Sequence, residues 1–576
     1  MKNFVIGVVV GVVVSGLTAL ILIFAFIKLV GSFGERPVSV ADASTLVFKL
    51  EGEVPEKSPP EIPLPLFQDQ TPMTVEQIWD TFRKAAADSR IKGIIFEPRG
   101  LEMGWAKMQE IHDEILQFKK SGKPIISYLR GPSAREYYLA AATDKIFLAP
   151  EDSLDLKGLR VEAVFIKNTL DKLGIHADVI HAGKYKDAGD MLTQTSMTPE
   201  THEVLDQVLD QLYGNLIDTV AQGRKKQSDA VKAIIDQGPF MANEALANGL
   251  IDAFGYEDQA ADDMKIRLKQ TELTKLSARA YSKTPPLSGG VNRRIALVVG
   301  EGEITRGSGN SNSDDLGITA AGFTKLLKQV EDDSSIKGVI IRVDSPGGDG
   351  VASDDILHAA KNLSKKKPVV ISMSDLAASG GYFISMTGDP IVAYPNTLTG
   401  SIGVIFARMS LHGLFDKIGV NKQMLKRGQF ADLDSDDAPL NEGQRQKIAG
   451  QIDAFYKSFV SRVADGRKKS FEQIEPLSQG RVWMGAQAKQ NGLVDELGGL
   501  DRAVELVRQR AHLAASDRIT LVPYPGKRSI FDVLFGRSDD SNALESKLEQ
   551  VLGNLPVAAL AKGGFLKLMP YSISVK

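Results

Sequence analysis

Short apolar runs alternate along the chain with segments whose apolar residues recur at helical spacing. Residues 336–343 and 368–373 are compact runs rich in β-branched side chains, which is typical of buried strands. Between them, apolar residues at 356, 359, 360 and 363 predict a helix over 352–363, and a further helix over 378–386 precedes a short strand at 391–393. Strands that alternate with helices predict an α/β fold with a mostly parallel sheet.

The amino-terminal region has a different pattern. Residues 4–27 form an uncharged run of 24 residues, about 36 Å long as a helix, whereas a hydrocarbon core needs about 30 Å. The apolar part of a cleaved signal peptide is shorter, about 7–15 residues. We therefore expect residues 1–30 to form one uncleaved transmembrane anchor, with the short leading tail in the cytoplasm and the body outside. A cleaved signal peptide and a buried core helix are the alternatives.

The chain matches itself at a shift near 245 residues. The sequence IKGII at 91–95 reappears as IKGVI at 336–340, and ALANGLID at 245–252 reappears as AKQNGLVD at 488–495. Ordered matches at one long shift indicate two copies of a whole domain. We predict a first copy over 45–277, a linker over 278–290, a second copy over 291–525 and a carboxy-terminal extension over 526–576 with no recognisable motif.

The amino-acid composition excludes several kinds of functional site. The chain has no cysteine, which excludes disulfides, thiolate metal sites and a cysteine nucleophile. Its formal net charge is −3, so no global field favours nucleic acid. The seven histidines are scattered without a metal-binding spacing, and we expect neither a metal nor an organic cofactor.

The second copy carries a candidate nucleophile. Ser379 follows the predicted strand at 368–373 and stands before two glycines at a strand–turn–helix junction, where a hydroxyl is exposed and a substrate backbone can approach. The aligned tyrosines Tyr137 and Tyr382 place Ala134 at the matching position of the first copy. The alternative interpretation of Ser379 is an ordinary helix N-cap.

A candidate oxyanion site precedes it. Gly347 and Gly348 come directly after the strand at 336–343, and adjacent glycines can turn their N–H groups toward one point. The first copy has Glu102 and Met103 there. An ordinary Pro-Gly turn is the alternative.

The first copy carries a candidate base. Lys186 aligns with Ala431 of the second copy, so each copy lacks the reactive group that the other keeps. This reciprocal loss is what one active site split between the copies would leave. The alternative is an ordinary solvated lysine.

Together these segments resemble signal peptide peptidase A in its long, tandem-repeat form. Residues 375–382, 345–348 and 399–403 are similar to that family's nucleophile, oxyanion and lysine-supporting motifs. The resemblance implies two crotonase-like domains, similar to the proteolytic subunit of Clp protease. It also implies a homotetramer in the bacterial inner membrane, with a periplasmic body that degrades cleaved signal peptides.

By this resemblance Ser379 is the nucleophile, Lys186 the general base, and Gly347 or Gly348 the oxyanion donor. Ser401 resembles the serine that hydrogen-bonds the lysine. Two positions depart from the pattern. Asp349 follows the glycine pair where a small residue is expected, and Asp187 follows the lysine, whose pKa a nearby carboxylate would raise.

The proposed reaction is acyl transfer to Ser379 followed by hydrolysis. A free lysine titrates near 10.4, so holding it neutral at pH 7 costs about 4.6 kcal/mol, and burial can supply that by penalising the ammonium form. We therefore expect Lys186 in an enclosed site within reach of Ser379 and Ser401, either in one chain or between chains. A peptidase of intact membrane or misfolded exported proteins, an acyl-CoA-binding crotonase-type enzyme and a non-catalytic membrane scaffold are the alternatives.

Overall fold

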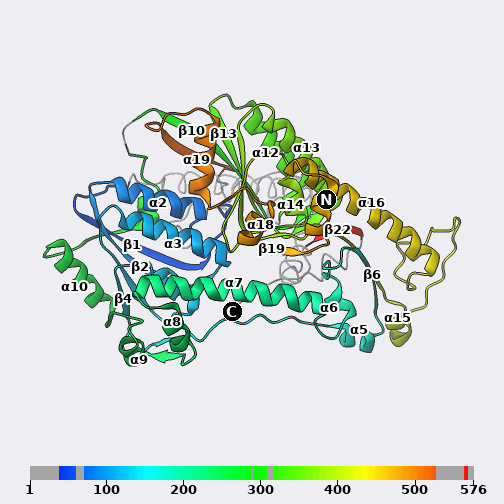
Figure 1. Cartoon of the computed structure of the whole chain (residues 1–576), viewed down its shortest axis with the longest axis horizontal. Helices are drawn as coiled ribbons and strands as arrows, with labels where there is room; N and C mark the ends of the chain where they lie inside the picture. Colours follow the sequence, from blue (N-terminus) through cyan, green and yellow to red (C-terminus); the bar gives the residue numbers. More distant parts are fainter. Residues whose placement is uncertain (1–37, 60–70, 288–289, 308–316, 527–563, 569–576) are drawn as a thin grey trace, which may run out of the picture.

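The computed structural model describes residues 38–59, 71–287, 290–307, 317–526 and the backbone of 564–568. The described residues form two mostly parallel sheets, one from each half of the chain; in Figure 1 the strands of the first lie at the left and those of the second toward the middle. The α/β class and the mostly parallel sheets are confirmed. The predicted anchor at 4–27 lies outside the described residues, among which no helix is long and apolar enough to cross a membrane.

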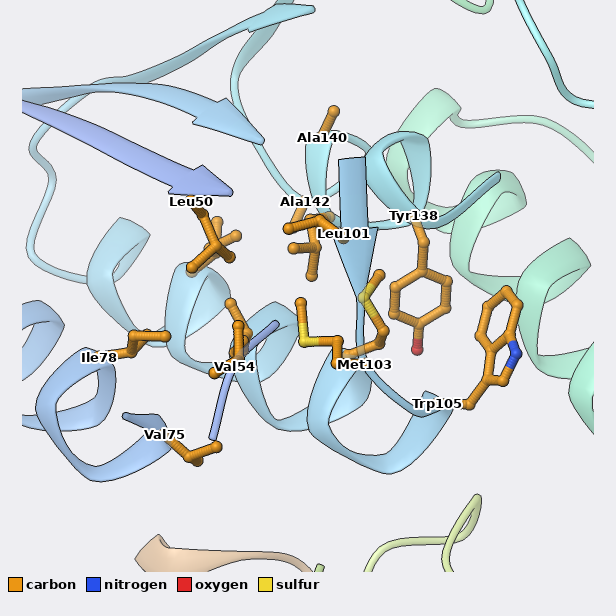
Figure 2. Close-up of a cluster of buried hydrophobic side chains, with 14 of the residues drawn as sticks. Leu50, Val54, Val75, Ile78, Leu101, Met103, Trp105, Tyr138, Ala140 and Ala142 are labelled. Atoms are coloured by element: carbon orange, nitrogen blue, oxygen red, sulfur yellow. The ribbon is translucent and has the colours of Figure 1, made fainter. Parts of the chain in front are cut away.

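The first sheet has six strands, all paired in parallel. Its order is β8 (Ala253–Phe254), β4 (Lys145–Leu148), β3 (Ile125–Leu129), β2 (Ile91–Glu102), β1 (Ser44–Glu53) and β9 (Thr274–Ser277). Helices α2 (Val75–Ala87), α3 (Trp105–Lys119) and α4 (Ala134–Ala140) pack beside these strands. Figure 2 shows part of this core, where Leu101 and Met103 lie between Val54 and the ring of Tyr138.

The second sheet repeats the plan. Its main path is β19 (Val482–Met484), β17 (Leu398–Gly400), β15 (Val369–Ala378), β13 (Ile336–Ser345), β10 (Asn292–Glu301) and β21 (Arg518–Tyr524), with β16 (Ile391–Ala393) and β20 (Glu496–Leu497) beside it. The pairs are parallel except β17 with β19. The helices are α12 (Ala320–Asp332), α13 (Gly350–Ser364), α14 (Gly380–Ile384) and α19 (Leu500–Arg510).

Two predicted bounds were wrong. β15 continues to Ala378, five residues beyond the predicted strand end at 373, and α14 begins at Gly380 instead of 378. The reason is a second pairing, because residues 376–378 bond to β17 beyond an irregularity in the register with β13. The strand therefore ends directly before Ser379.

Equivalent side chains make equivalent contacts in the two copies. Tyr137 Oη donates to Leu250 O at 2.6 Å, and Tyr382 Oη donates to Leu493 O at 2.7 Å. Helices α7 (Pro199–Arg224) and α16 (Glu442–Arg467) both have 26 residues. The copies also share a core, since one apolar cluster contains Ile111 of α3 together with second-copy residues of β13 and β15.

A third, mixed sheet joins the copies. Its order is β12 (Ile318–Thr319), β11 (Ile304–Thr305), β14 (Gly347–Asp349), β22 (Gly564–Leu568), β18 (Val404–Ser410) and β6 (His176–Ala182). β6 comes from the first copy and pairs antiparallel with β18 of the second over seven residues. Figure 1 shows β6 at one end of the molecule, near α5 (Lys167–Leu173), α6 (Asp190–Thr193) and α15 (His412–Ile418).

Candidate active site

Ser379 lies at the junction between β15 and α14. Its backbone has φ 53° and ψ −112°, a conformation that non-glycine residues rarely adopt and that persists only where the surroundings hold it. One restraint is the hydrogen bond from Ser379 N to Gly400 O, at 2.8 Å. Ser379 occupies the N-cap position of α14, yet its side chain makes no capping hydrogen bond. The N-cap alternative therefore does not account for the hydroxyl.

Lys186 reaches the second copy through β6. The register pairs Ala182, the last residue of β6, with Val404 of β18, and Lys186 follows four residues later. Its Nζ atom lies 2.9 Å from Ser379 Oγ, 2.9 Å from Ser401 Oγ and 3.0 Å from Ser401 O. All three residues have no exposed surface. The structure thus brings the predicted residues together within one chain, and the solvated-lysine alternative is wrong.

Ser401 also has an unusual backbone. Its φ is 51°, and its N–H donates to Arg481 O at 2.7 Å. This left-handed conformation at a residue with a side chain is costly. Here it presents both the hydroxyl and the carbonyl of Ser401 to one amine.

The Gly347–Gly348 pair lies close to Gly380, the residue that follows the proposed nucleophile. Gly347 and Gly348 have φ values of 104° and 150°, which only glycine adopts readily. A Cβ atom built on Gly380 would lie 3.1 Å from Gly347 Cα and 3.1 Å from Gly348 N. The Gly347 N–H donates to Ser345 Oγ at 3.2 Å. The two glycines therefore adjoin the residue that follows Ser379.

Both departures from the family pattern have structural partners. Asp349 caps α13, since its Oδ1 accepts hydrogen bonds from Val351 N at 2.9 Å and Ala352 N at 2.8 Å. Asp187 accepts from Thr201 Oγ1. Burial raises the pKa of Asp187 to about 7, although the hydrogen bond from Thr201 lowers it. Near neutral pH the carboxyl beside Lys186 is therefore often protonated, which weakens its hold on a cation.

Two glycines of the second copy make room for Lys186. A Cβ atom on Gly480 would lie 2.5 Å from Lys186 Cβ, and one on Gly403 would lie 3.0 Å from Lys186 Cδ. The predicted lysine-supporting motif contains Gly403. Sequence reasoning missed Gly480, because its contact with Lys186 depends on the long-range pairing of β6 with β18.

β22 borders the glycine pair. It pairs antiparallel with β14, where Gly347 faces Leu568 and Gly348 faces Lys567, and with β18, where Ile405 faces Leu566. A segment of the chain's own carboxy-terminal region thus lies as an extended strand between two strands of the site.

The site contains no arrangement suited to a metal. Among the residues that the structure describes, no group of three or more histidine, cysteine, aspartate or glutamate side chains is placed to hold one. What the site offers is a hydroxyl against an amine, with strained backbone on either side. That pairing is suited to transfer of an acyl group through the hydroxyl.

The fold and site define a class of α/β proteins built from two tandem copies, with a buried serine–lysine pair formed between them. The family model described as Peptidase family S49 matches residues 117–271 and 361–514, one match in each copy. The chain therefore belongs to peptidase family S49 and carries its domain in two tandem copies.

Two relatives cover most of the chain. It is 36% identical over 494 residues to "Serine protease SPPA, chloroplastic" of Arabidopsis thaliana, spanning 84% of this chain and 73% of that protein. It is 32% identical over 463 residues to "Protease 4" of Haemophilus influenzae, spanning 76% of this chain and 73% of that protein. Among solved structures, a ClpP1 mutant of Listeria monocytogenes covers 35% of this chain and 91% of its own, with 19% identity and a TM-score of 0.23. The crotonase-like fold therefore stays a prediction.

Proposed function

We propose that the chain is a serine endopeptidase in which Ser379 is the nucleophile and Lys186 the general base. One observation carries the proposal: the two groups come from different copies of the repeat and meet at 2.9 Å with no exposed surface. A lysine taken out of water is favoured in its neutral form, and a neutral amine is what a base requires. Membership of a peptidase family supports the same reading.

The contacts of the amine fit this role. A neutral amine has two N–H donors and one lone pair. We assign the two donors to Ser401 O and Ser401 Oγ, which leaves the lone pair for the hydroxyl proton of Ser379, whose Oγ lies 2.9 Å from Nζ. Ser401 would accordingly orient the base.

The reaction proceeds in two halves. Ser379 Oγ forms a bond to the peptide carbonyl carbon while its proton passes to Lys186 Nζ. The carbonyl oxygen becomes an oxyanion beside the glycine pair, where we propose the backbone N–H of Gly347 or Gly348 as donor. The carbon–nitrogen bond then breaks, and the departing amine takes the proton from Lys186. Water then gives a proton to Lys186 Nζ as its oxygen bonds to the acyl carbon. The ester bond to Ser379 Oγ breaks, and Ser379 Oγ takes the proton back from Lys186, which restores the free enzyme.

We propose extended apolar peptides, including cleaved signal peptides, as the substrates. β22 supports this, because it demonstrates that a strand fits between β14 and β18 beside the glycines, and strand addition is a common mode of peptide recognition.

We further propose anchoring to the bacterial inner membrane through residues 1–30, with the body on the periplasmic side. Assembly into a homotetramer completes the proposal.

The test compares full-length variants in detergent with a fluorogenic apolar peptide. Ser379→Ala and Lys186→Ala are each expected to lose activity by at least about 100-fold. Ser385→Ala, which alters a buried serine six residues away, and Lys84→Ala, which alters a buried lysine of the first copy, serve as controls. Full activity in Lys186→Ala would mean that another base serves Ser379. A wild-type chain that cleaves no peptide would favour the scaffold, and bound acyl-CoA would favour the crotonase-type alternative.

A further inference from the structure

Helix α3 of the first copy is capped by a residue of the second. Gly104 precedes α3 and offers no side-chain cap. Instead, the carboxylate of Asp375 accepts hydrogen bonds from Gly104 N and from Lys107 N, both at 2.9 Å. The equivalent helix of the second copy, α13, is capped by its own Asp349. The first copy thus lacks a cap that the second supplies.

Gly104 is required for this contact. A Cβ atom at position 104 would lie 2.4 Å from the Asp375 Cγ atom, well inside any allowed separation. Asp349 aligns with Gly104 at a shift of 245. The capping position therefore holds an aspartate in the second copy and a glycine, which has no side chain, in the first.

Lys107 extends the contact into a buried charge cluster. Its Nζ atom lies 2.8 Å from Asp344 Oδ2, 4.0 Å from Asp375 Oδ2 and 3.8 Å from Glu301 Oε1, and it donates to Val54 O at 3.2 Å. Lys107 is 6% exposed. Burial lowers the pKa of Lys107, but the surrounding carboxylates raise it by a larger amount. The net pKa is therefore raised, and the ammonium form is retained.

The two aspartates lie on the strands that lead into the site. Asp344 is on β13, three residues before Gly347, and its Oδ1 accepts from Leu376 N at 3.0 Å. That bond bridges the irregularity between β13 and β15. Asp375 is on β15, four residues before Ser379. One ammonium of the first copy therefore lies between the two strands, 2.8 Å from Asp344 and 4.0 Å from Asp375, close to where the strands lead into the glycine pair and the serine.

We propose that Lys107 is a positioning residue for the peptidase site. By binding Asp344 and Asp375 together, it fixes the distance between the Gly347–Gly348 turn and Ser379. The idea rests on the proposed function, and it adds a second contribution of the first copy to a site in the second. Lys107 acts through these strands and touches neither substrate nor Ser379.

The test measures kcat and KM of the full-length chain with a fluorogenic apolar peptide. Lys107→Met is expected to lower kcat by about 100-fold, the effect of misplacing reacting groups by about 1 Å, with KM changed by less than about twofold. Lys84→Met is the matched control. Lys84 is a buried lysine, 7% exposed, of the first copy that donates to Ser282 O and Thr284 O. The Lys84→Met variant is expected to be less stable than wild type and to keep the wild-type kcat. Lys107→Arg should recover most of the lost kcat.

A second variant keeps the test decisive if Lys107→Met does not fold. Asp375→Asn removes the charge that faces the Lys107 ammonium and keeps one of the two oxygens that cap α3. It therefore also loses one cap hydrogen bond, and it should lower kcat by about tenfold. Both variants should also speed hydrogen exchange at the amides of Gly348 and Ser379. Equal kcat in Lys107→Met and Lys84→Met, or unchanged kcat in Asp375→Asn, would overturn the proposal.

The exchange measurement separates this proposal from the peptidase function itself. If Ser379→Ala still cleaves the peptide, the proposed nucleophile is wrong, whatever Lys107 does. Unchanged exchange at Gly348 and Ser379 in Lys107→Met would refute positioning even in a chain that proved inactive.

Discussion

Replacing Gly480 by alanine should inactivate the site without altering any proposed catalytic group. The added Cβ atom would lie 2.5 Å from Lys186 Cβ and 2.6 Å from Lys186 N, whereas ordinary van der Waals contact begins near 3.4 Å. The main chain at Lys186 must therefore retreat by about 1 Å. Because Nζ lies 2.9 Å from Ser379 Oγ, such a shift takes the pair beyond hydrogen-bonding distance. We expect kcat to fall by about 100-fold.

Gly388→Ala is the matched control for backbone strain. Gly480 and Gly388 have φ values of +75° and +90°, so alanine at either position costs about 1–2 kcal/mol of stability. A Cβ atom at position 388, however, meets nothing within 4 Å. Gly388→Ala should lower the melting temperature and leave kcat unchanged.

The assay is cleavage of a fluorogenic apolar peptide, with thermal unfolding measured in parallel. A fluorophosphonate that labels the nucleophilic serine gives an independent reading of Ser379 reactivity. If Gly480→Ala retains the kcat and labelling rate of Gly388→Ala, then the separation of Lys186 from Ser379 does not govern the rate. The proposed role of Lys186 would then be refuted.

Three further predictions concern other parts of the molecule. The pKa of Asp187 is raised by burial from 3.8 to about 7, so its neutral form stabilises the fold at low pH and that stability is lost as pH rises through 7. Asp187→Asn should be more stable than wild type by roughly 2–4 kcal/mol at pH 8 and equal at pH 3.5 in urea unfolding; a pH-independent difference would contradict this. Truncation after Gly526 removes β22 from between β14 and β18, and KM for an apolar peptide should fall; a higher KM would argue against binding by strand addition. Leu425 is 97% exposed and follows the exposed Ile418 and Val420, so Leu425→Glu should lower the mass of the proposed tetramer measured by light scattering. An unchanged mass would exclude this surface from the proposed assembly.

Much of the fold and site was predictable because it depends on local patterns. The apolar runs at 336–343 and 391–393 became β13 and β16, and helical spacing over 352–363 became α13. The pairing of Lys186 with Ser379 was also predictable, because duplication provides an internal comparison in which each copy lacks one reactive group.

The remainder depends on contacts that no local pattern encodes. β15 runs past its predicted end because residues 376–378 find a second partner in β17. Asp375 belongs to the nucleophile motif by position, but it acts as a cap for a helix about 270 residues earlier in the chain. The role of Gly480 likewise appears only when β6 has crossed into the third sheet.

The crossing of β6 explains how a duplicated domain could divide one site. In each copy the strand–turn–helix junction and the candidate lysine position lie on different elements. A serine and a lysine from different copies can therefore meet if one strand of one copy pairs with a strand of the other. Here β6 pairs with β18 over seven residues, and Lys186 follows it into the second copy. Once that pairing exists, a serine in the first copy has no partner, and Ala134 stands there. The cap that Gly104 lacks follows the same logic, because Asp375 fills it only while the copies stay docked. The pairing of Lys186 with Ser379 and the cap on α3 therefore both require the two copies to be docked.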